Sequence, residues 1–157
     1  MKATISLSII VKNESNVILT MLNSVYKLLD YYVVVDTGST DNTKEIIKNF
    51  FNEKGIPGEI IDHKWKNYGD ARNVALDAIK GKADFGFWID ADDEFIIDSN
   101  FNINEFKTNL INYDGIICNY YGNKSNYKNM PFFSIKKNFK WIGALHEILY
   151  CDNYYNL

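Results

Sequence analysis

Apolar residues follow two different spacings along the first 90 positions of the chain. Four segments are short, apolar and rich in β-branched or aromatic residues, which is typical of buried strands. These segments are residues 5–11, 32–35, 59–62 and 85–89. Between them, apolar residues recur every three or four positions, which predicts amphipathic helices. The predicted helices cover residues 17–29, 42–54 and 70–80.

Residues able to begin or end a helix flank these segments. Ser15 and Asp41 precede the first two helices and are expected to cap them, and Gly55 is placed to end the second. Strand and helix alternate in this half, so we expect an α/β fold whose mostly parallel sheet carries helices on both faces.

The pattern changes after about residue 95. Residues 105–111 fit a short helix, and residues 115–121, 130–135 and 145–150 look extended, with a lysine-rich turn before the last. This half is predicted to be mixed and partly antiparallel. The length of 157 residues fits a single domain spanning 1–157.

Composition excludes several classes of protein. A hydrophobic content of 46% indicates a folded chain, and a net charge of −3 argues against nucleic acid as a partner. The N-terminus lacks an apolar signal region and no apolar stretch approaches the roughly 18 residues that span a bilayer, so we expect a cytoplasmic protein without a transmembrane segment. Cys118 and Cys151 fit no metal-binding spacing. Reduced thiols are favoured, with a disulfide left open.

Polar residues gather where predicted strands end. Asn13 and Glu14 follow the first strand, Asp36 and Thr37 the second, and residues 90–94 (DADDE) the fourth. Ligands of parallel α/β sheets bind beyond the carboxyl ends of the strands. We therefore expect the three clusters to converge on one crevice.

The strongest chemical signal is residues 87–94 (FWIDADDE). In an extended chain Asp90 and Asp92 point the same way and form a hard oxygen site suited to Mg²⁺ or Mn²⁺, which completes its shell with water and substrate phosphates. An EF-hand is excluded because Phe95 and Phe101 stand where it needs Gly and Glu. The acidic pair also lies too late in the chain for a haloacid-dehalogenase-type phosphatase.

Three further positions are hard to explain by folding alone. Asp36 ends a buried strand and needs a partner, while Gly38 permits a tight turn beside it. Arg72, the only arginine, lies in the first turn of a helix, so we expect it to bind a carboxylate (Asp36 or Asp90) or a ligand phosphate. His146 lies in an apolar stretch and is a candidate third metal ligand.

Taken together, residues 6–14 (SLSIIVKNE), 35–41 (VDTGSTD), 71–73 (ARN) and 89–93 (IDADD) resemble family 2 glycosyltransferases with the GT-A fold. The Asp-Thr-Gly-Ser-Thr-Asp and Ala-Arg-Asn motifs, with residues 143–147, resemble one subgroup. The resemblance implies an inverting glycosyltransferase that uses Mn²⁺ or Mg²⁺. Its donor would be a nucleotide-diphosphate sugar, with a UDP-sugar favoured, and its acceptor an unidentified glycan, protein or lipid-linked molecule. Residues 1–95 would bind the donor and residues 96–157 would face the acceptor.

The resemblance also assigns residues. Asp92 and His146 would bind the metal, Asp92 and Glu147 would be catalytic, and Glu147 is the local candidate for the general base. The positions expected to contact the donor are Val11, Asn13, Glu14, Asp36, Gly38, Arg72, Asp90 and Ala91.

Two departures from the family pattern keep alternatives open. Thr37 stands where many members have a second Asp that contacts uracil, which weakens the preference for uridine. The Glu-Asp pair that usually supplies the base does not occur before Leu157, so the chain is either part of a longer enzyme or a non-catalytic module that binds a nucleotide sugar or glycan. A sugar-nucleotide pyrophosphorylase is disfavoured, because residues 11–15 (VKNES) are not a glycine-rich basic loop.

Overall fold

A computed structural model describes residues 1–121 and 126–152 of the chain. In chain order its elements are β1 (Ile5–Val11), α1 (Ile18–Val25), the 3-10 helix η1 (Tyr26–Leu28), β2 (Tyr31–Asp36), α2 (Thr43–Lys54), β3 (Gly58–Asp62), α3 (Tyr68–Ala78), β4 (Phe85–Phe87), α4 (Ile103–Leu110), β5 (Gly115–Tyr121), β6 (Asn126–Ser134), β7 (Phe139–Ile142) and β8 (Ile148–Cys151). The alternation expected in the first half is confirmed.

A six-stranded sheet in the order β3-β2-β1-β4-β6-β5 forms the centre of the fold. β1, β2, β3 and β4 pair in parallel, whereas β6 pairs antiparallel with β4 and β5. β7 and β8 form a separate antiparallel hairpin. The prediction of a mostly parallel sheet with a mixed, partly antiparallel second half is therefore confirmed, and strands from both halves of the chain build one sheet.

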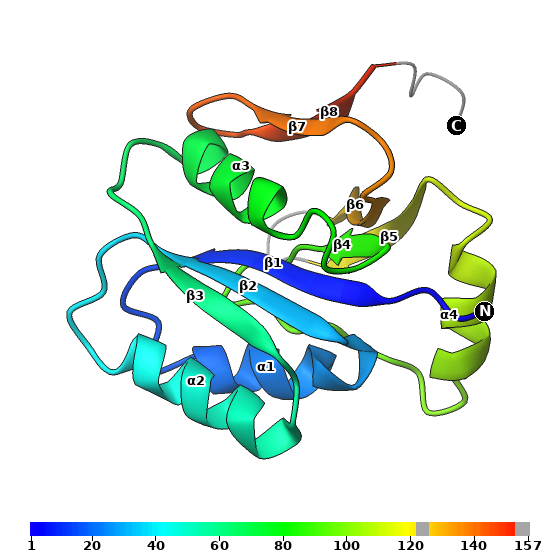
Figure 1. The fold of residues 1–157 in the computed structure, drawn as a ribbon, viewed down its shortest axis with the longest axis horizontal. Coiled ribbons are helices and arrows are strands. Elements are labelled where there is room, and N and C mark those ends of the chain that lie inside the picture. The colour runs from blue at the N-terminus through cyan, green and yellow to red at the C-terminus, as the bar shows by residue number, and fades with distance from the viewer. Residues whose placement is uncertain (122–125, 153–157) are drawn as a thin grey trace.

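Helices cover both faces of this sheet (Figure 1). α1 and α2 lie on one face, and α3 lies on the other beneath the β7–β8 hairpin. Alternate strand residues face opposite ways, so Tyr32 and Val34 join the apolar core against α1 and α2, while Val33 and Val35 join the core against α3. Ala71 and Ala75 bring α3 close to the sheet, because their small side chains are completely buried there.

Neither predicted cap occupies the N-cap position of its helix, which is Val17 in α1 and Asn42 in α2, although Asp41 bonds to the first residue of α2. α1 ends at Val25 and continues only as a 3-10 turn, and its N-terminus has no side-chain cap. Ser15, the predicted cap, instead donates its backbone N–H to Asp41 Oδ2 at 3.2 Å. Asp41 Oδ1 accepts the backbone N–H of Thr43, the first residue of α2, at 3.0 Å. Gly55 ends α2 in the left-handed conformation (φ 67°), as predicted.

Strand β7 lies in the lysine-rich segment where a turn was predicted, so that prediction was wrong over 139–142. Phe139 and Trp141 are buried while Lys140 and Ile142 are exposed, a two-residue period that the flanking lysines obscured. β8 begins at Ile148, later than predicted, because residues 143–147 turn back with positive φ at Gly143 and His146.

Two further predictions concerned the state of the cysteines, for which reduced thiols were favoured, and the absence of a transmembrane segment. Cys118 and Cys151 are both free thiols. Within the part of the chain that the structure describes, no helix combines the length and apolar character needed to cross a bilayer.

Candidate functional site

A cleft with a volume of about 890 Å³ opens at the carboxyl ends of the parallel strands. The ends of β1 and β4, the first turns of α3, strand β6 and the loop between β7 and β8 all contribute to its walls. Its lining residues are Ile10, Val11, Lys12, Glu14, Thr37, Trp65, Tyr68, Arg72, Trp88, Asp90, Ala91, Asp92, Tyr127, Asn129, Trp141, Leu145, His146 and Glu147. Most of the residues predicted to form a site therefore share one cavity.

Arg72 is the best-defined cation of this cleft. Its side chain is only 7% exposed, and its Nη2 lies 2.5 Å from Asp90 Oδ1 while its Nε lies 2.6 Å from Glu147 Oε1. The guanidinium also lies against the rings of Trp88 and Trp141, at 4.9 and 5.0 Å from their centroids. Of the partners proposed for Arg72 from sequence, Asp90 is confirmed and Asp36 is wrong.

Not every donor of Arg72 is used. Its Nη1 is buried and, among the described residues, no acceptor lies within hydrogen-bond distance. A buried N–H without a partner is costly in free energy, and an acceptor oxygen entering the cleft would relieve that cost.

β7 and the loop that follows it are held against α3 by hydrogen bonds between the Asn73 side chain and the backbone of β7, as well as by charge. Asn73 Nδ2 donates to the carbonyl of Trp141 at 2.9 Å, and its Oδ1 accepts the N–H of Trp141 at the same distance. Gly69 packs so closely on Gly143 that an added Cβ would overlap the carbonyl oxygen of Gly143. Tight contacts with α3 therefore position His146 and Glu147.

Glu14 and Asp92 give the opposite wall its negative charge. Burial raises the pKa of the Glu14 carboxyl, and the nearby carboxylates of Asp92, Asp41 and Asp90 raise it further. Asp92 is exposed, and none of the described residues forms a hydrogen bond or ion pair with its carboxylate. A cation beside Glu14 and Asp92 would relieve their mutual repulsion.

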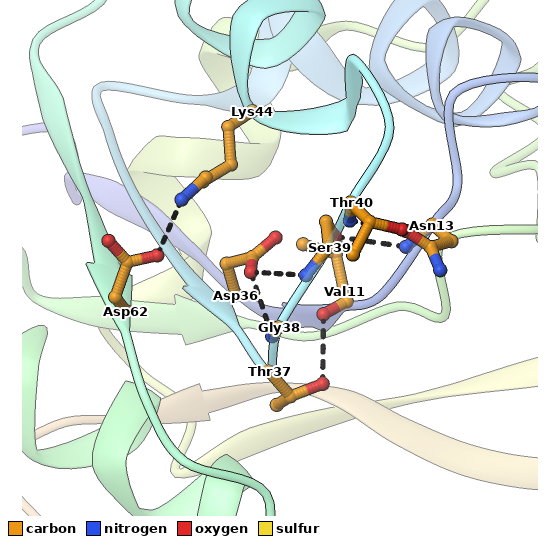
Figure 2. Close-up of polar contacts among 9 residues, drawn as sticks. All are labelled: Val11, Asn13, Asp36, Thr37, Gly38, Ser39, Thr40, Lys44 and Asp62. Carbon is orange, nitrogen blue, oxygen red and sulfur yellow. Dashed lines mark hydrogen bonds and ion pairs between the residues drawn. The ribbon is translucent and has the colours of Figure 1, made fainter.

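Asp36 occupies a different place from the one predicted (Figure 2). It is 1% exposed and does not line the cleft, and its Oδ1 accepts the backbone N–H groups of Gly38 and Ser39 at 2.9 and 2.8 Å. Asp36 follows Val34 on the α1–α2 face of the sheet, whereas Thr37 follows Val35 and reaches the cleft. The turn that follows β2 thus supplies partners for Oδ1, whereas Oδ2 is buried and has no hydrogen-bond partner among the described residues.

Asn13 and Gly38 also lie outside the cleft lining. Asn13 joins two loops, because its Oδ1 accepts the N–H of Thr40 at 2.8 Å and its own N–H donates to Ser39 Oγ at 2.9 Å (Figure 2). Gly38 adopts φ 107°, which glycine tolerates and other residues rarely adopt. The predicted convergence therefore holds for one or more residues of each cluster, namely Glu14, Thr37 and residues 90–92, but not for Asn13, Asp36, Asp93 and Glu94.

The two residues predicted to bind a metal ion, Asp92 and His146, both line the cleft. Over residues 1–121 and 126–152, no group of three or more His, Cys, Asp or Glu side chains is arranged to hold a metal ion. A cation here would therefore need oxygen ligands from a bound molecule or from water.

Sequence reasoning missed several side chains of the cleft. Trp88 and Trp141 pack edge-to-face on each other and both contact Arg72, and Tyr127 and Asn129 of β6 complete the far wall. Trp88 adjoins the acidic loop, so its place in the cleft could have been predicted from the sequence. The places of Tyr127 and Asn129 could not, because only the antiparallel pairing of β6 with β4 brings these residues to the cleft.

Comparison with known proteins was consistent with this fold. The model of the family "Glycosyl transferase family 2" matches residues 6–148 of the chain. The SPbeta prophage-derived glycosyltransferase SunS of Bacillus subtilis (strain 168) is 40% identical over 90 residues, which are 57% of this chain and 20% of SunS. The chain thus spans about a fifth of that relative's length.

Solved structures share the fold. Residues 1–349 of TarS from S. aureus match 58% of this chain and 28% of that one, with 28% identity and a TM-score of 0.50. In complex with UDP, TarS matches 73% of this chain and 34% of that one, with 21% identity and a TM-score of 0.56. The mannosyltransferase PcManGT from Pyrobaculum calidifontis, in complex with GDP-Man and Mn²⁺, matches 62% of this chain and 30% of that one, with 20% identity and a TM-score of 0.52.

Proposed function

The chain belongs to glycosyl transferase family 2, and on that basis we propose that its cleft binds a nucleotide-diphosphate sugar and that the protein transfers the sugar to an acceptor hydroxyl with inversion. The observation that carries this proposal is the meeting of Arg72, Asp90 and Asp92 in one cleft at the carboxyl ends of β1 and β4. Ligands of α/β sheets bind at this edge.

Arg72 is suited to an anionic ligand. Ion pairs with Asp90 and Glu147, together with contacts to the rings of Trp88 and Trp141, hold its guanidinium in place. Its buried, unpartnered Nη1 is then available to an oxygen of the diphosphate or of the sugar. A fixed donor stabilises charge without reorganising during the reaction, which is how an enzyme lowers a barrier that involves a developing anion.

We propose that Asp92 and His146 hold Mn²⁺ or Mg²⁺ together with the donor diphosphate. The exposed, unpaired carboxylate of Asp92 fits a hard cation that takes few protein ligands and completes its shell with phosphates. When bound, the ion neutralises charge on the departing diphosphate. We propose a structural role for Asp90, because its Oδ1 accepts a hydrogen bond from Arg72 and so links the acidic loop to α3.

In the proposed reaction the acceptor oxygen attacks the anomeric carbon from the side opposite the diphosphate. The new carbon–oxygen bond forms while the bond to the diphosphate breaks with its electron pair, and the acceptor proton passes to a base. Glu147 remains a prediction for that base. Its Oε1 accepts from Arg72 and its side chain is 10% exposed, so we also propose that it orients Arg72.

UDP and Mn²⁺ are the ligands to test first, since TarS and PcManGT, which share the fold, were solved with UDP and with GDP-Man and Mn²⁺ respectively. We expect UDP with Mn²⁺ to stabilise the protein by about 2.7 kcal/mol at a hundredfold excess over the dissociation constant. Thermal unfolding measures this shift. A melting curve that is unchanged at millimolar UDP and Mn²⁺ contradicts the proposal.

Asp92→Asn is expected to abolish the part of the UDP shift that depends on Mn²⁺, because it removes the one unpaired carboxylate of residues 90–92. Asp98→Asn makes the same change of charge outside the cleft and should keep the shift. Turnover of a UDP-sugar with Mn²⁺ present then separates an enzyme from a binding module, which would show the shift without forming product.

A further inference from the structure

A second cleft, with a volume of about 640 Å³, lies on the other side of the acidic loop. The two clefts share Trp88, Asp90, Asp92, Tyr127 and Asn129, so the loop at residues 90–92 forms a common wall. A molecule in the second cleft would therefore adjoin the sugar of a donor held in the first.

The charge of the second cleft is one-sided. Asp90, Asp92, Asp93 and Glu94 line it, and its described lining contains no Lys, Arg or His. Asp90 is paired with Arg72 of the first cleft, but Asp93 and Glu94 have no ion-pair partner among the described residues, so they would repel an additional negative charge brought here.

Aromatic rings form the opposite wall. Tyr120 and Tyr127 stack with their centroids 4.5 Å apart, and the hydroxyl of Tyr120 donates to Asp93 Oδ1 at 2.6 Å. This hydrogen bond sets the pair of rings beside the acidic loop. Ile96, 82% exposed, adds an apolar rim. Such a wall suits a ligand with a flat apolar face.

We propose that the second cleft is the acceptor site and that it selects an uncharged glycoside, excluding the same ring when it carries a negative charge. The apolar face of the ring lies on Tyr120 and Tyr127, and a ring hydroxyl points across Asp92 towards the donor. This inference rests on the proposed function. In the transfer, the hydroxyl oxygen bonds to the anomeric carbon, the diphosphate leaves with the electron pair of the broken bond, and the hydroxyl proton passes to the base, for which Glu147 is the prediction.

Two probes that differ by one charge test the selection. 4-Nitrophenyl β-glucoside is uncharged, and 4-nitrophenyl β-glucuronide carries a carboxylate on the same ring. With UDP and Mn²⁺ present, we expect the glucoside to bind saturably in calorimetry and the glucuronide to bind at least about tenfold more weakly, a difference of about 1.4 kcal/mol. Equal affinities for the two probes overturn the proposal.

Variants then test whether residues of the second cleft cause the difference in affinity between the two glycosides. Asp93→Asn combined with Glu94→Gln should bring the two affinities to within about threefold, whereas Asp98→Asn, outside both clefts, should keep the tenfold difference. Tyr120→Ala should weaken glucoside binding by at least about tenfold. Discrimination that survives in the double variant shows that the selection arises elsewhere and overturns the proposal.

The change in melting temperature with UDP and Mn²⁺ distinguishes failure of the acceptor inference from failure of the proposed function. If UDP and Mn²⁺ stabilise the protein but neither glycoside binds, the acceptor inference fails and the proposed function stands. If UDP does not stabilise the protein, the proposed function fails and the acceptor role fails with it.

Discussion

At the scale of single residues, Arg72 joins parts of the chain that are far apart in sequence. It binds Asp90, 18 positions away, and Glu147, 75 positions away. It also packs against two mutually contacting tryptophans, one from β7 and one from the segment that follows β4. One buried side chain thus connects α3, the acidic loop and the β7–β8 loop, and so helps to fix the shape of the cleft.

Glu14 offers a pH-dependent test at the same scale. Its raised pKa means that the folded protein binds this proton more tightly than the unfolded chain does. The protonated carboxyl therefore stabilises the fold below the unfolded pKa, near 4.5. This contribution is lost as the pH rises through the pKa of the folded state. Glu14→Gln should therefore raise the free energy of unfolding at pH 7, by less than about 1 kcal/mol, because solvent screens the site. The gain should vanish below pH 4.5.

Asp41→Asn provides a control of opposite sign. Hydrogen bonds from Thr43 and Ser15 lower the pKa of Asp41, so its stabilising contribution is present at neutral pH and is lost only in acid. This variant should be less stable than the wild type at pH 7, measured by urea unfolding in parallel with Glu14→Gln. Equal effects of the two variants at pH 7 would contradict the assigned environments.

At the scale of elements, α3 organises the site. Its alanine face approaches β1 and β2, its second turn carries Arg72, and the Asn73 side chain bonds to the backbone of β7. Gly69 allows the end of β7 to approach α3 closely, because the carbonyl of Gly143 occupies the space that a side chain at position 69 would need. The hairpin can therefore lie directly on the helix and present residues 145–147 to the cleft.

Gly69→Ala tests this close approach. Alanine would favour the helix by about 1 kcal/mol, but its Cβ would overlap a backbone carbonyl, which has no rotamer to escape into. We expect a net loss of about 1–3 kcal/mol in the free energy of unfolding, measured by urea denaturation. Asp77→Ala, on the exposed side of the same helix, should change it by less than about 0.5 kcal/mol. A Gly69→Ala variant more stable than the wild type would rule out the contact.

At the scale of the whole molecule, the central sheet is covered on both faces, whereas β7 and β8 pair only with each other. The two clefts lie on either side of one loop that leaves β4, the strand where the parallel and antiparallel parts of the sheet meet. Each cleft is lined by residues from both halves of the chain, so the donor and acceptor sites, as proposed, would each be built by both halves.

Hydrogen exchange should reflect this arrangement. Amides of β1 are buried between two paired strands, so we expect them to exchange only on global unfolding, while amides of β8 exchange through local opening of the hairpin. Native-state exchange followed by mass spectrometry would compare the peptides of these strands. Equal protection of β1 and β8 would show that the hairpin opens only when the whole domain unfolds.

Much of the fold was readable along the chain, because strands and helices impose short periods on the sequence. The buried strand at residues 5–11, the left-handed end of α2 at Gly55 and the acidic loop after β4 all follow from neighbouring residues. Strand β7 escaped detection because its two-residue period covers only four positions and adjoins charged lysines.

What local pattern left open was which side chains meet. Asp36 and Thr37 are neighbours, yet the pleat turns Asp36 into the loop that follows its strand and Thr37 into the cleft. The partners of Arg72 depend on how α3 and the β7–β8 hairpin pack on the sheet, over separations that no periodicity encodes. Short-range spacing thus predicts elements and the types of residue at their ends, whereas packing alone determines the contacts among those residues.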